Sequence, residues 1–167
     1  MLPVWTLEVE ETSSISHEVI IAMRSDFIPH PTLQGEGRCA ICDLPYGDYV
    51  PREVAHHRGF HRRFLGALDD GWAPLPEETR SRLRRQGLDR QGRPDATFEE
   101  RLAGATDFFT AKLHDYWFGV LYMDVPPTSV ARYFVKRIDE KGLLDSYGQD
   151  VVEEMRGRYA SDTVAVV

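Results

Sequence analysis

The sequence predicts an α+β fold with a β-hairpin segment, a small module containing cysteines and histidines, and a mainly helical C-terminal part. Three observations predict it. Apolar and polar residues alternate near the N-terminus, two cysteines precede a group of histidines, and a long apolar stripe with helical spacing fills the last third. The corresponding segments are 1–37, 38–70 and 97–167, with a connector rich in arginine and proline over 71–96.

The β-hairpin is expected early in the chain. Trp5, Leu7 and Val9 alternate with polar residues, which is the period of a half-buried strand. The stretch 18–23 is short and rich in β-branched residues, and a serine-rich turn separates it from the first strand. Prolines and glycines over 29–37 end regular structure before the cysteines.

Two helices are expected in the middle of the chain. Pro51 is suited to the first turn of a helix that runs to about residue 68, because the N–H that proline lacks has no partner there. Pro76 opens a shorter helix that ends at about residue 86, inside the connector.

The C-terminal part is expected to contain three helices. Thr97 and Glu100 form a capping box, and one face of the next helix is apolar. The members of this face are Phe98, Leu102, Ala105, Phe109, Leu113, Tyr116 and Val120. Pro126 and Pro127 end it, Thr128 can cap a helix that reaches residue 138 before Gly142, and the last helix covers about 149–159.

Composition predicts a folded, soluble protein. Hydrophobic residues make up 42% and aromatic residues 11% of the 167 residues, too much apolar surface for a disordered chain. No leader pattern opens the sequence, and uncharged apolar runs such as 117–123 are too short to span a bilayer. We therefore expect an intracellular, cytoplasmic protein with no membrane partner.

The cysteines and histidines have the spacing of a metal site. They read Cys39-x2-Cys42-x14-His57-x3-His61, within the range of sites with two cysteines and two histidines. A tight turn can present both thiolates, and histidines four apart lie on one helix face. His56 is a rival ligand, but positions five apart point about 140° away from each other on a helix. The spacing predicts one structural Zn²⁺ held by Cys39, Cys42, His57 and His61.

A redox role is the alternative for the two cysteines. A redox Cys-x-x-Cys should open a helix within a βαβ unit, whereas this pair precedes a loop bounded by proline and glycine, with histidines in reach. The metal interpretation is therefore favoured.

Residues 39–65 resemble the C2H2 zinc finger of the sister-chromatid cohesion acetyltransferases. The shared residues are Cys39, Cys42, Leu44, Tyr46, Pro51, His57, His61, Phe64 and Leu65, and the chain has Asp43 where the family has glycine. The resemblance ends after Leu65, and no glycine-rich turn for the pyrophosphate of acetyl-CoA follows. It implies a zinc-finger module over 38–70 that serves as an accessory element, with Tyr46, Pro51 and Phe64 as supporting residues.

Charge directs the search for an anion contact to the middle of the chain. The formal net charge is −7, yet residues 49–101 hold eleven bases, all arginine, against nine acids. The arginines considered for nucleic-acid contact are Arg58, Arg62, Arg63, Arg80, Arg82, Arg84 and Arg85. A solvated helix face paired with nearby acids is the alternative explanation.

Sequence-specific DNA reading is disfavoured. If His57 is the first metal-binding histidine of a ββα finger, the base-reading positions are Val50, Glu53 and His56. Valine offers no hydrogen bond to a base edge, and good readers carry Arg, Lys, Asn or Gln there. Any contact is therefore expected to be made with the phosphate backbone of the nucleic acid, not with base edges.

No catalytic set accompanies these features. His114 and Asp115 lack further metal ligands at suitable spacing and are expected to be a surface pair on a helix. Tyr116, Trp117 and Phe118 follow one another around the same helix, so at least one should face away from the apolar stripe and offer a partner surface.

The function expected from the sequence is that of a zinc-binding, non-enzymatic interaction or assembly protein with a protein partner or with self-assembly. A viral or prophage structural component, located in the virion, is one form of this expectation. The alternatives are a nucleic-acid-binding accessory protein that uses the arginine-rich middle third, and a divergent acetyltransferase relative.

Overall fold

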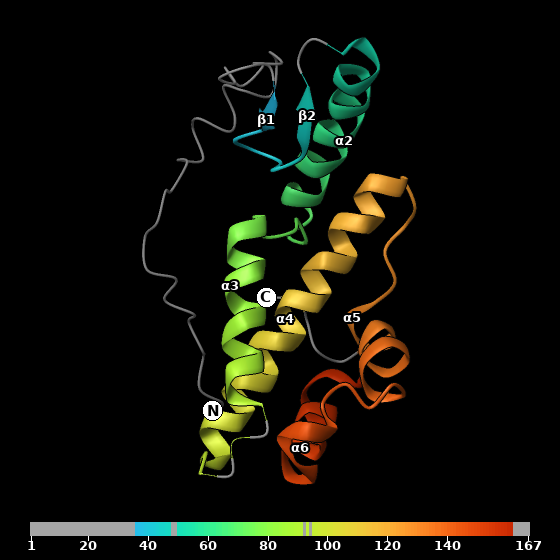
Figure 1. Ribbon diagram of the computed structural model, residues 1–167. Helices are drawn as coiled ribbons and strands as arrows, with labels where there is room; N and C mark the ends of the chain where they lie inside the picture. The colour runs from blue at the N-terminus through green and yellow to red at the C-terminus, as the bar shows by residue number, and fades with distance from the viewer. Residues whose placement is uncertain (1–35, 48–49, 92, 94, 162–167) are drawn as a thin grey trace.

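A computed structural model describes residues 36–47, 50–91, 93 and 95–161, and it is mostly helical (Figure 1). The strands are β1 (Glu36–Arg38) and β2 (Pro45–Gly47). The α-helices are α2 (Pro51–Asp69), α3 (Glu77–Arg90), α4 (Phe98–Met123), α5 (Val130–Tyr133) and α6 (Gln149–Tyr159). A π-helical turn (Phe134–Asp139) continues α5, and a 3₁₀ turn (Asp145–Tyr147) precedes α6. The mainly helical C-terminal part is thus confirmed.

The predicted N-terminal hairpin, with strands near 5–9 and 18–23, lies outside the described residues. A different and smaller hairpin is present instead. β1 and β2 pair in antiparallel register, with Gly37 opposite Tyr46, and the two cysteines lie in the turn between them. Each strand has three residues, which is shorter than the runs by which strands are recognised in a sequence.

α3 and α4 run side by side in opposite directions and form the long axis of the molecule (Figure 1). Two glycines make their close approach possible. A Cβ atom on Gly87 would lie 2.8 Å from the carbonyl oxygen of Gly104, and one on Gly104 would lie 2.8 Å from the Cβ of Arg90. α3 is therefore a packed element, longer than the helix predicted for 76–86, and the segment 71–96 is more than a connector.

α4 carries the predicted apolar face and begins with the predicted capping box. Thr97 Oγ1 accepts from the backbone N–H of Glu100 at 3.2 Å, and Glu100 Oε2 accepts from the N–H of Thr97 at 2.8 Å. These bonds satisfy two amide groups that no helical carbonyl reaches. The start of α4 was therefore predicted correctly.

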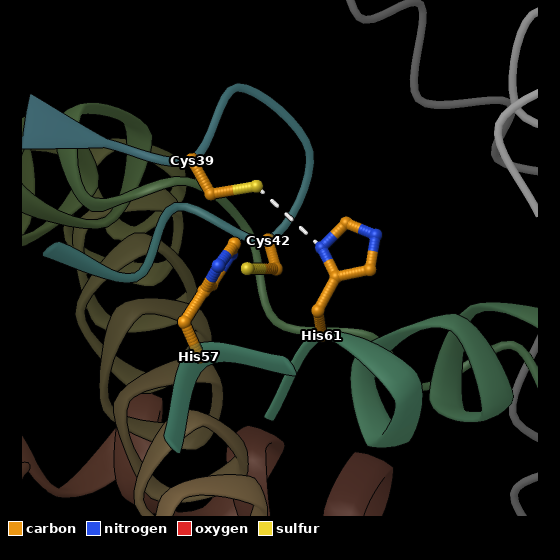
Figure 2. A group of neighbouring side chains, drawn as sticks. All are labelled: Cys39, Cys42, His57 and His61. Atoms are coloured by element: carbon orange, nitrogen blue, oxygen red, sulfur yellow. Dashed lines mark hydrogen bonds between the residues drawn. The ribbon is translucent and has the colours of Figure 1, made fainter. Parts of the chain in front are cut away.

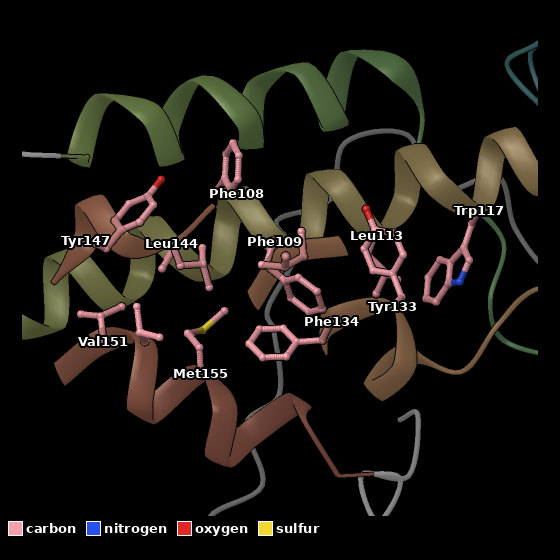
Figure 3. Close-up of a cluster of buried hydrophobic side chains, with 13 residues drawn as sticks. Phe108, Phe109, Leu113, Trp117, Tyr133, Phe134, Leu144, Tyr147, Val151 and Met155 are labelled. Carbon is pink, nitrogen blue, oxygen red and sulfur yellow. The ribbon is translucent and has the colours of Figure 1, made fainter. Parts of the chain in front are cut away.

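The larger hydrophobic core lies between α4, α5, the π-helical turn and α6 (Figure 3). Phe109 of α4 meets Phe134 edge to face, with ring centroids 5.4 Å apart. Tyr147, from the 3₁₀ turn, donates its hydroxyl hydrogen to the carbonyl of Gly87 at 2.8 Å and so ties this core to α3. Ser129, rather than the expected Thr128, caps α5 by accepting from the N–H of Arg132.

Within the described part of the chain, no helix has both the length and the apolar character needed to cross a membrane.

Candidate metal centre

Four candidate metal ligands meet where α2 lies against the β1–β2 turn (Figure 2). The sulfur atoms of Cys39 and Cys42 and one ring nitrogen each from His57 and His61 all lie within 4.8 Å of one another. Among the residues that the structure describes, this is the one group of three or more such side chains that could hold a metal ion. The arrangement is compatible with one metal site.

The hairpin turn directs both cysteine side chains toward α2. The N–H of Asp43 donates to the Cys39 carbonyl at 2.9 Å, and the N–H of Cys39 donates to the Leu44 carbonyl at 3.0 Å. Asp43 closes the turn with a left-handed backbone conformation, φ 57°. Aspartate adopts this conformation more readily than most residues other than glycine.

α2 supplies the two histidines from adjacent helical turns. His61 Nδ1 lies 3.5 Å from Cys39 Sγ. With metal–ligand bonds of about 2.3 Å to sulfur and about 2.0 Å to nitrogen, a tetrahedral zinc site separates these two atom types by about 3.5 Å. This pair of side chains therefore already has the separation that a tetrahedral site requires.

Residues around the ligands hold His57 in place. His57 is fully buried, and the Tyr46 ring stacks on its imidazole with centroids 4.0 Å apart and an interplanar angle of 12°. Phe64 is buried in the same cluster, and Pro51 is the first residue of α2. The three supporting residues that the motif implied thus lie in or beside the module formed by β1, β2 and α2, which we call the Cys/His module.

The two thiols form a coupled acid pair. A hydrogen bond with Cys42, assisted by bonds with His57 and His61, lowers the pKa of the Cys39 thiol. The same bond with Cys39, together with burial, raises the pKa of the Cys42 thiol. Metal binding to both sulfur atoms requires both thiols to give up their protons, so it would be coupled to proton release.

No protein-family model, curated protein or solved structure matches this chain significantly. The resemblance of residues 39–65 to the cohesion acetyltransferase finger stays a prediction from the motif.

His56 lies outside the group of ligands. Its exposed ring meets Tyr122 of α4 edge to face, with centroids 4.7 Å apart. Its neighbour His57 points toward the cysteines instead, as expected for residues about 100° apart around a helix.

Sequence reasoning missed the residue that joins the hairpin to α2. Glu53 Oε2 accepts a 2.6 Å hydrogen bond from the N–H of Gly47, the last residue of β2. Glu53 stands three positions after the N-cap Val50, where a capping-box glutamate would stand. Because the N-cap is valine rather than serine or threonine, the sequence pattern that marks a capping box was absent.

The Cys/His module packs on the last turns of α4. Phe60 of α2 is fully buried, and its ring lies 5.1 Å from that of Phe118, while Leu121 completes the same hydrophobic cluster. Arg63 Nε donates to the Leu121 carbonyl at 2.7 Å, which satisfies a carbonyl group in the last turn of α4.

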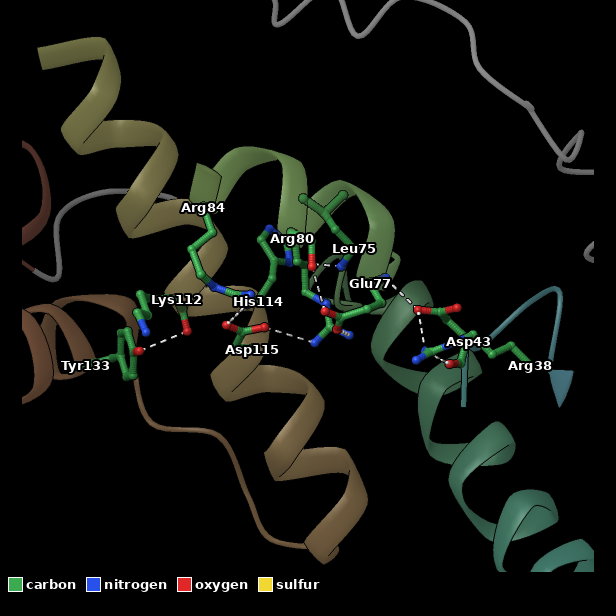
Figure 4. A network of polar contacts seen from close by, with 11 residues as sticks. Arg38, Asp43, Leu75, Glu77, Arg80, Arg84, Lys112, His114, Asp115 and Tyr133 are labelled. Atoms are coloured by element: carbon green, nitrogen blue, oxygen red, sulfur yellow. Dashed lines mark hydrogen bonds and ion pairs between the residues drawn. The ribbon is translucent and has the colours of Figure 1, made fainter. Parts of the chain in front are cut away.

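The same module also reaches the start of α3 (Figure 4). Asp43 Oδ2 accepts from the N–H of Glu77, the first residue of α3, at 2.5 Å. A carboxylate is favourable at the positive end of a helix dipole, as a guanidinium is at the negative end. Since α3 starts and α4 ends beside the module, Asp43 and Arg63 cap both helices from one side.

The seven arginines considered for nucleic-acid contact are divided between α2 and α3. Arg80 is buried and pairs with Glu77 and Asp115, so its charge is neutralised inside the fold. Arg84 pairs with Asp115 at 2.5 Å, and Arg63 is engaged at the end of α4. The side chains of the other four are exposed, namely Arg58, Arg62, Arg82 and Arg85.

The base-reading positions have contacts within the molecule. Val50 is half-buried at the start of α2, Glu53 holds Gly47, and His56 meets Tyr122. Of these positions, only His56 has a described contact with α4, and Glu53 is bonded to β2 instead.

The prediction that His114 and Asp115 form a surface pair was wrong. They belong to a polar network between α3 and α4 (Figure 4). His114 Nδ1 accepts from the N–H of Leu75 at 3.1 Å. Burial, with a smaller contribution from the charge of Arg80, lowers the pKa of His114 to about 4. Both side chains therefore serve packing between helices, and His114 is neutral at pH 7.

The aromatic triplet of α4 is distributed over three contacts. Tyr116 stacks on Tyr133, Trp117 is buried in the larger core, and Phe118 packs on Phe60. The guanidinium of Arg80 covers the Phe118 ring, 4.6 Å from its centroid. The face of α4 that carries Phe118, which was expected to contact a partner, is covered by the Cys/His module.

Proposed function

We propose that this chain is a zinc-stabilised, non-enzymatic interaction or assembly protein in which one Zn²⁺ has a structural role. The convergence of Cys39, Cys42, His57 and His61 carries the proposal. Two thiolates and two imidazoles in a tetrahedral arrangement are a donor set typical of zinc.

A structural role fits the donor set better than a catalytic one. Catalytic zinc sites keep a coordination position open for water or substrate, whereas four protein ligands fill the tetrahedron. Both cysteines and His57 are also buried, with exposed fractions of 5%, 0% and 0%. Water and substrate would have poor access to an ion at this place.

The role we propose for the ion is to hold the end of the α3–α4 pair. The hairpin and α2 already meet through the Tyr46–His57 stack and the Glu53–Gly47 hydrogen bond, and zinc would add two ligands from each. Asp43 and Arg63 would then stay in position at the ends of α3 and α4. The free energy of metal binding would in this way support the helical part as well as the module.

A nucleic-acid role receives less support. Arg63, Arg80 and Arg84 are engaged within the protein, and two of the reading positions, Glu53 and His56, contact the chain itself. The overall charge of −7 also opposes binding to phosphate at long range.

Two adjacent histidines provide a matched test of the site. His57→Asn should remove a ligand, so the purified variant should hold much less than one zinc per chain and unfold at a lower temperature. His56→Asn changes a neighbouring exposed ring in the same way and should keep one zinc per chain. Equal zinc content in both variants would contradict the assignment.

The assembly part of the proposal is tested separately by measuring the mass of the zinc-loaded protein in solution over a range of concentrations, and by recovery of a specific protein partner. A monomer at all concentrations that also recovers no partner would contradict it.

A further inference from the structure

We propose that His61 is the exchangeable ligand of the metal site, and that its release opens one coordination position toward solvent. A ligand of the imidazole or thiolate class, supplied from outside the chain, can bind the metal at that position. The inference rests on the proposed zinc site and concerns how the ion enters and leaves it. Three observations separate His61 from the other three ligands.

The first observation is burial. Cys39, Cys42 and His57 are buried, whereas His61 is half-buried and is therefore the ligand that borders solvent. A buried ligand can leave the metal only if the hydrophobic cluster around it opens, which costs part of the stability of the fold. A ligand at the border can leave by rotation of its own side chain.

The second observation is the orientation of the His61 ring. Its Nδ1 lies 3.5 Å from Cys39 Sγ, and Figure 2 shows the second ring nitrogen directed away from the other ligands. Metal-bound histidines are usually fixed by a hydrogen bond from the second nitrogen to a protein group or to water. Within the part of the chain that the structure describes, the hydrogen bond of the His61 side chain is its contact with Cys39. No described protein group therefore fixes this ring from behind.

The third observation is the contrast with His57. The Tyr46 ring stacks on the His57 imidazole with centroids 4.0 Å apart, and both side chains are buried. The strand that carries Tyr46 is itself joined to α2 by the hydrogen bond between Glu53 and Gly47. The His57 ring cannot turn away from the cysteines unless Tyr46 moves, so the site contains one enclosed histidine and one accessible histidine.

These contacts determine what remains when His61 leaves. Cys39, Cys42 and His57 would keep the ion in a site with three protein ligands, which is the arrangement of zinc sites with one open position. In the exchange, the bond from the metal to Nδ1 of His61 breaks and a bond to the external donor forms, with no transfer of electrons. Zinc prefers nitrogen and sulfur donors, so imidazole and thiolate are the expected classes of ligand.

Cobalt substitution in the full-length protein tests the proposal, because the visible absorption of Co²⁺ reports its coordination geometry. His61→Ala should still bind one Co²⁺, and added imidazole should restore the spectrum of the unmodified protein. Imidazole should not restore it in His57→Ala, because Tyr46 encloses that position.

The rate of zinc release to a chelator gives a second comparison. His61→Ala should release zinc about tenfold or more faster than the unmodified protein, and imidazole should slow this release. His56→Ala is the matched control, since it removes an exposed ring of the same helix outside the group of ligands, and it should leave the rate unchanged.

A third measurement needs no variant, so it holds even where His57→Ala fails to fold. Long-range ¹H–¹⁵N spectra of the zinc-loaded protein should show His61 bound to the metal through Nδ1. Binding through Nε2 would overturn the proposal, as would loss of all metal from His61→Ala or a release rate equal to that of the unmodified protein. An unmodified protein that binds no metal would instead remove the proposed zinc site itself.

Discussion

Asp43 links the cysteine turn to the helical part through a single side chain. Its backbone has φ 57°, where the family that the segment resembles has glycine, and its carboxylate accepts from the first N–H of α3. Glycine would supply the backbone conformation but not the hydrogen bond. Aspartate provides both.

Two substitutions separate these contributions. Asp43→Ala should lower the free energy of unfolding of the zinc-loaded protein by about 2 kcal/mol, with about half from the left-handed backbone and half from the lost cap. Asp43→Asn keeps an oxygen acceptor and tolerates the backbone, so it should cost only about 0.5 kcal/mol. Urea unfolding measures both values, and equal losses in the two variants would contradict this division between backbone and cap.

His114 gives the second prediction at this scale. Its folded-state pKa of about 4 lies below the ordinary value of 6.5, so between these pH values the unfolded chain binds more protons than the folded one. The stability that neutral His114 contributes is present above pH 6.5 and is lost as the pH falls toward 4. Between pH 7 and pH 5 this loss should amount to about 2 kcal/mol.

His114→Asn is the variant that checks this pH dependence, because its amide oxygen can still accept from Leu75. Loss of zinc in acid affects both proteins, so the difference between their urea unfolding curves isolates His114. The variant should lose about 2 kcal/mol less than the unmodified protein between the two pH values. Parallel losses would contradict the assignment.

Among the elements, α3 and α4 depend on glycine at their crossing. Gly87→Ala places a Cβ atom 2.8 Å from both the Gly104 carbonyl oxygen and the Phe108 Cβ, so the helices must separate. We expect a loss of about 2 kcal/mol in the free energy of unfolding. Gly66→Ala is the matched control, because nothing lies within 4 Å of that position on α2. It should gain up to about 1 kcal/mol from helix propensity. Thermal unfolding compares them, and destabilisation by both would contradict the close crossing.

The sequence indicated elements with strong local signals and missed those set by tertiary contact. Pro51 and the Thr97 capping box mark the starts of α2 and α4 because proline and threonine act within their own turns. α3 was predicted too short and was placed in a connector, because its residues are strongly polar on average. Its contact with α4 is made through Gly87 and not through an apolar stripe that a sequence pattern would show. β1 and β2 are too short to show a period of two.

The candidate site was more predictable than its surroundings. Ligand spacing and helix phase follow from local geometry, so they selected His57 over His56 before any tertiary information. The contacts of Asp43 with α3 and of Arg63 with α4 join residues 34 and 58 positions apart, and no local pattern marks such pairs.

For the whole molecule, these contacts imply that the Cys/His module and the helical part unfold together. Phe118 and Leu121 of α4 pack in the hydrophobic cluster of the module, and Phe109 and Leu113 of α4 pack in the C-terminal core. α4 therefore belongs to both hydrophobic clusters, and loss of order in one should reach the other.

Thermal unfolding of the full-length protein with and without bound zinc tests the central claim most directly, when metal content is measured in the same samples. We expect about one zinc per chain and a single unfolding transition, and removal of the metal should lower the midpoint for the helical signal as a whole. A zinc-free protein with the same midpoint would contradict the structural role of the metal.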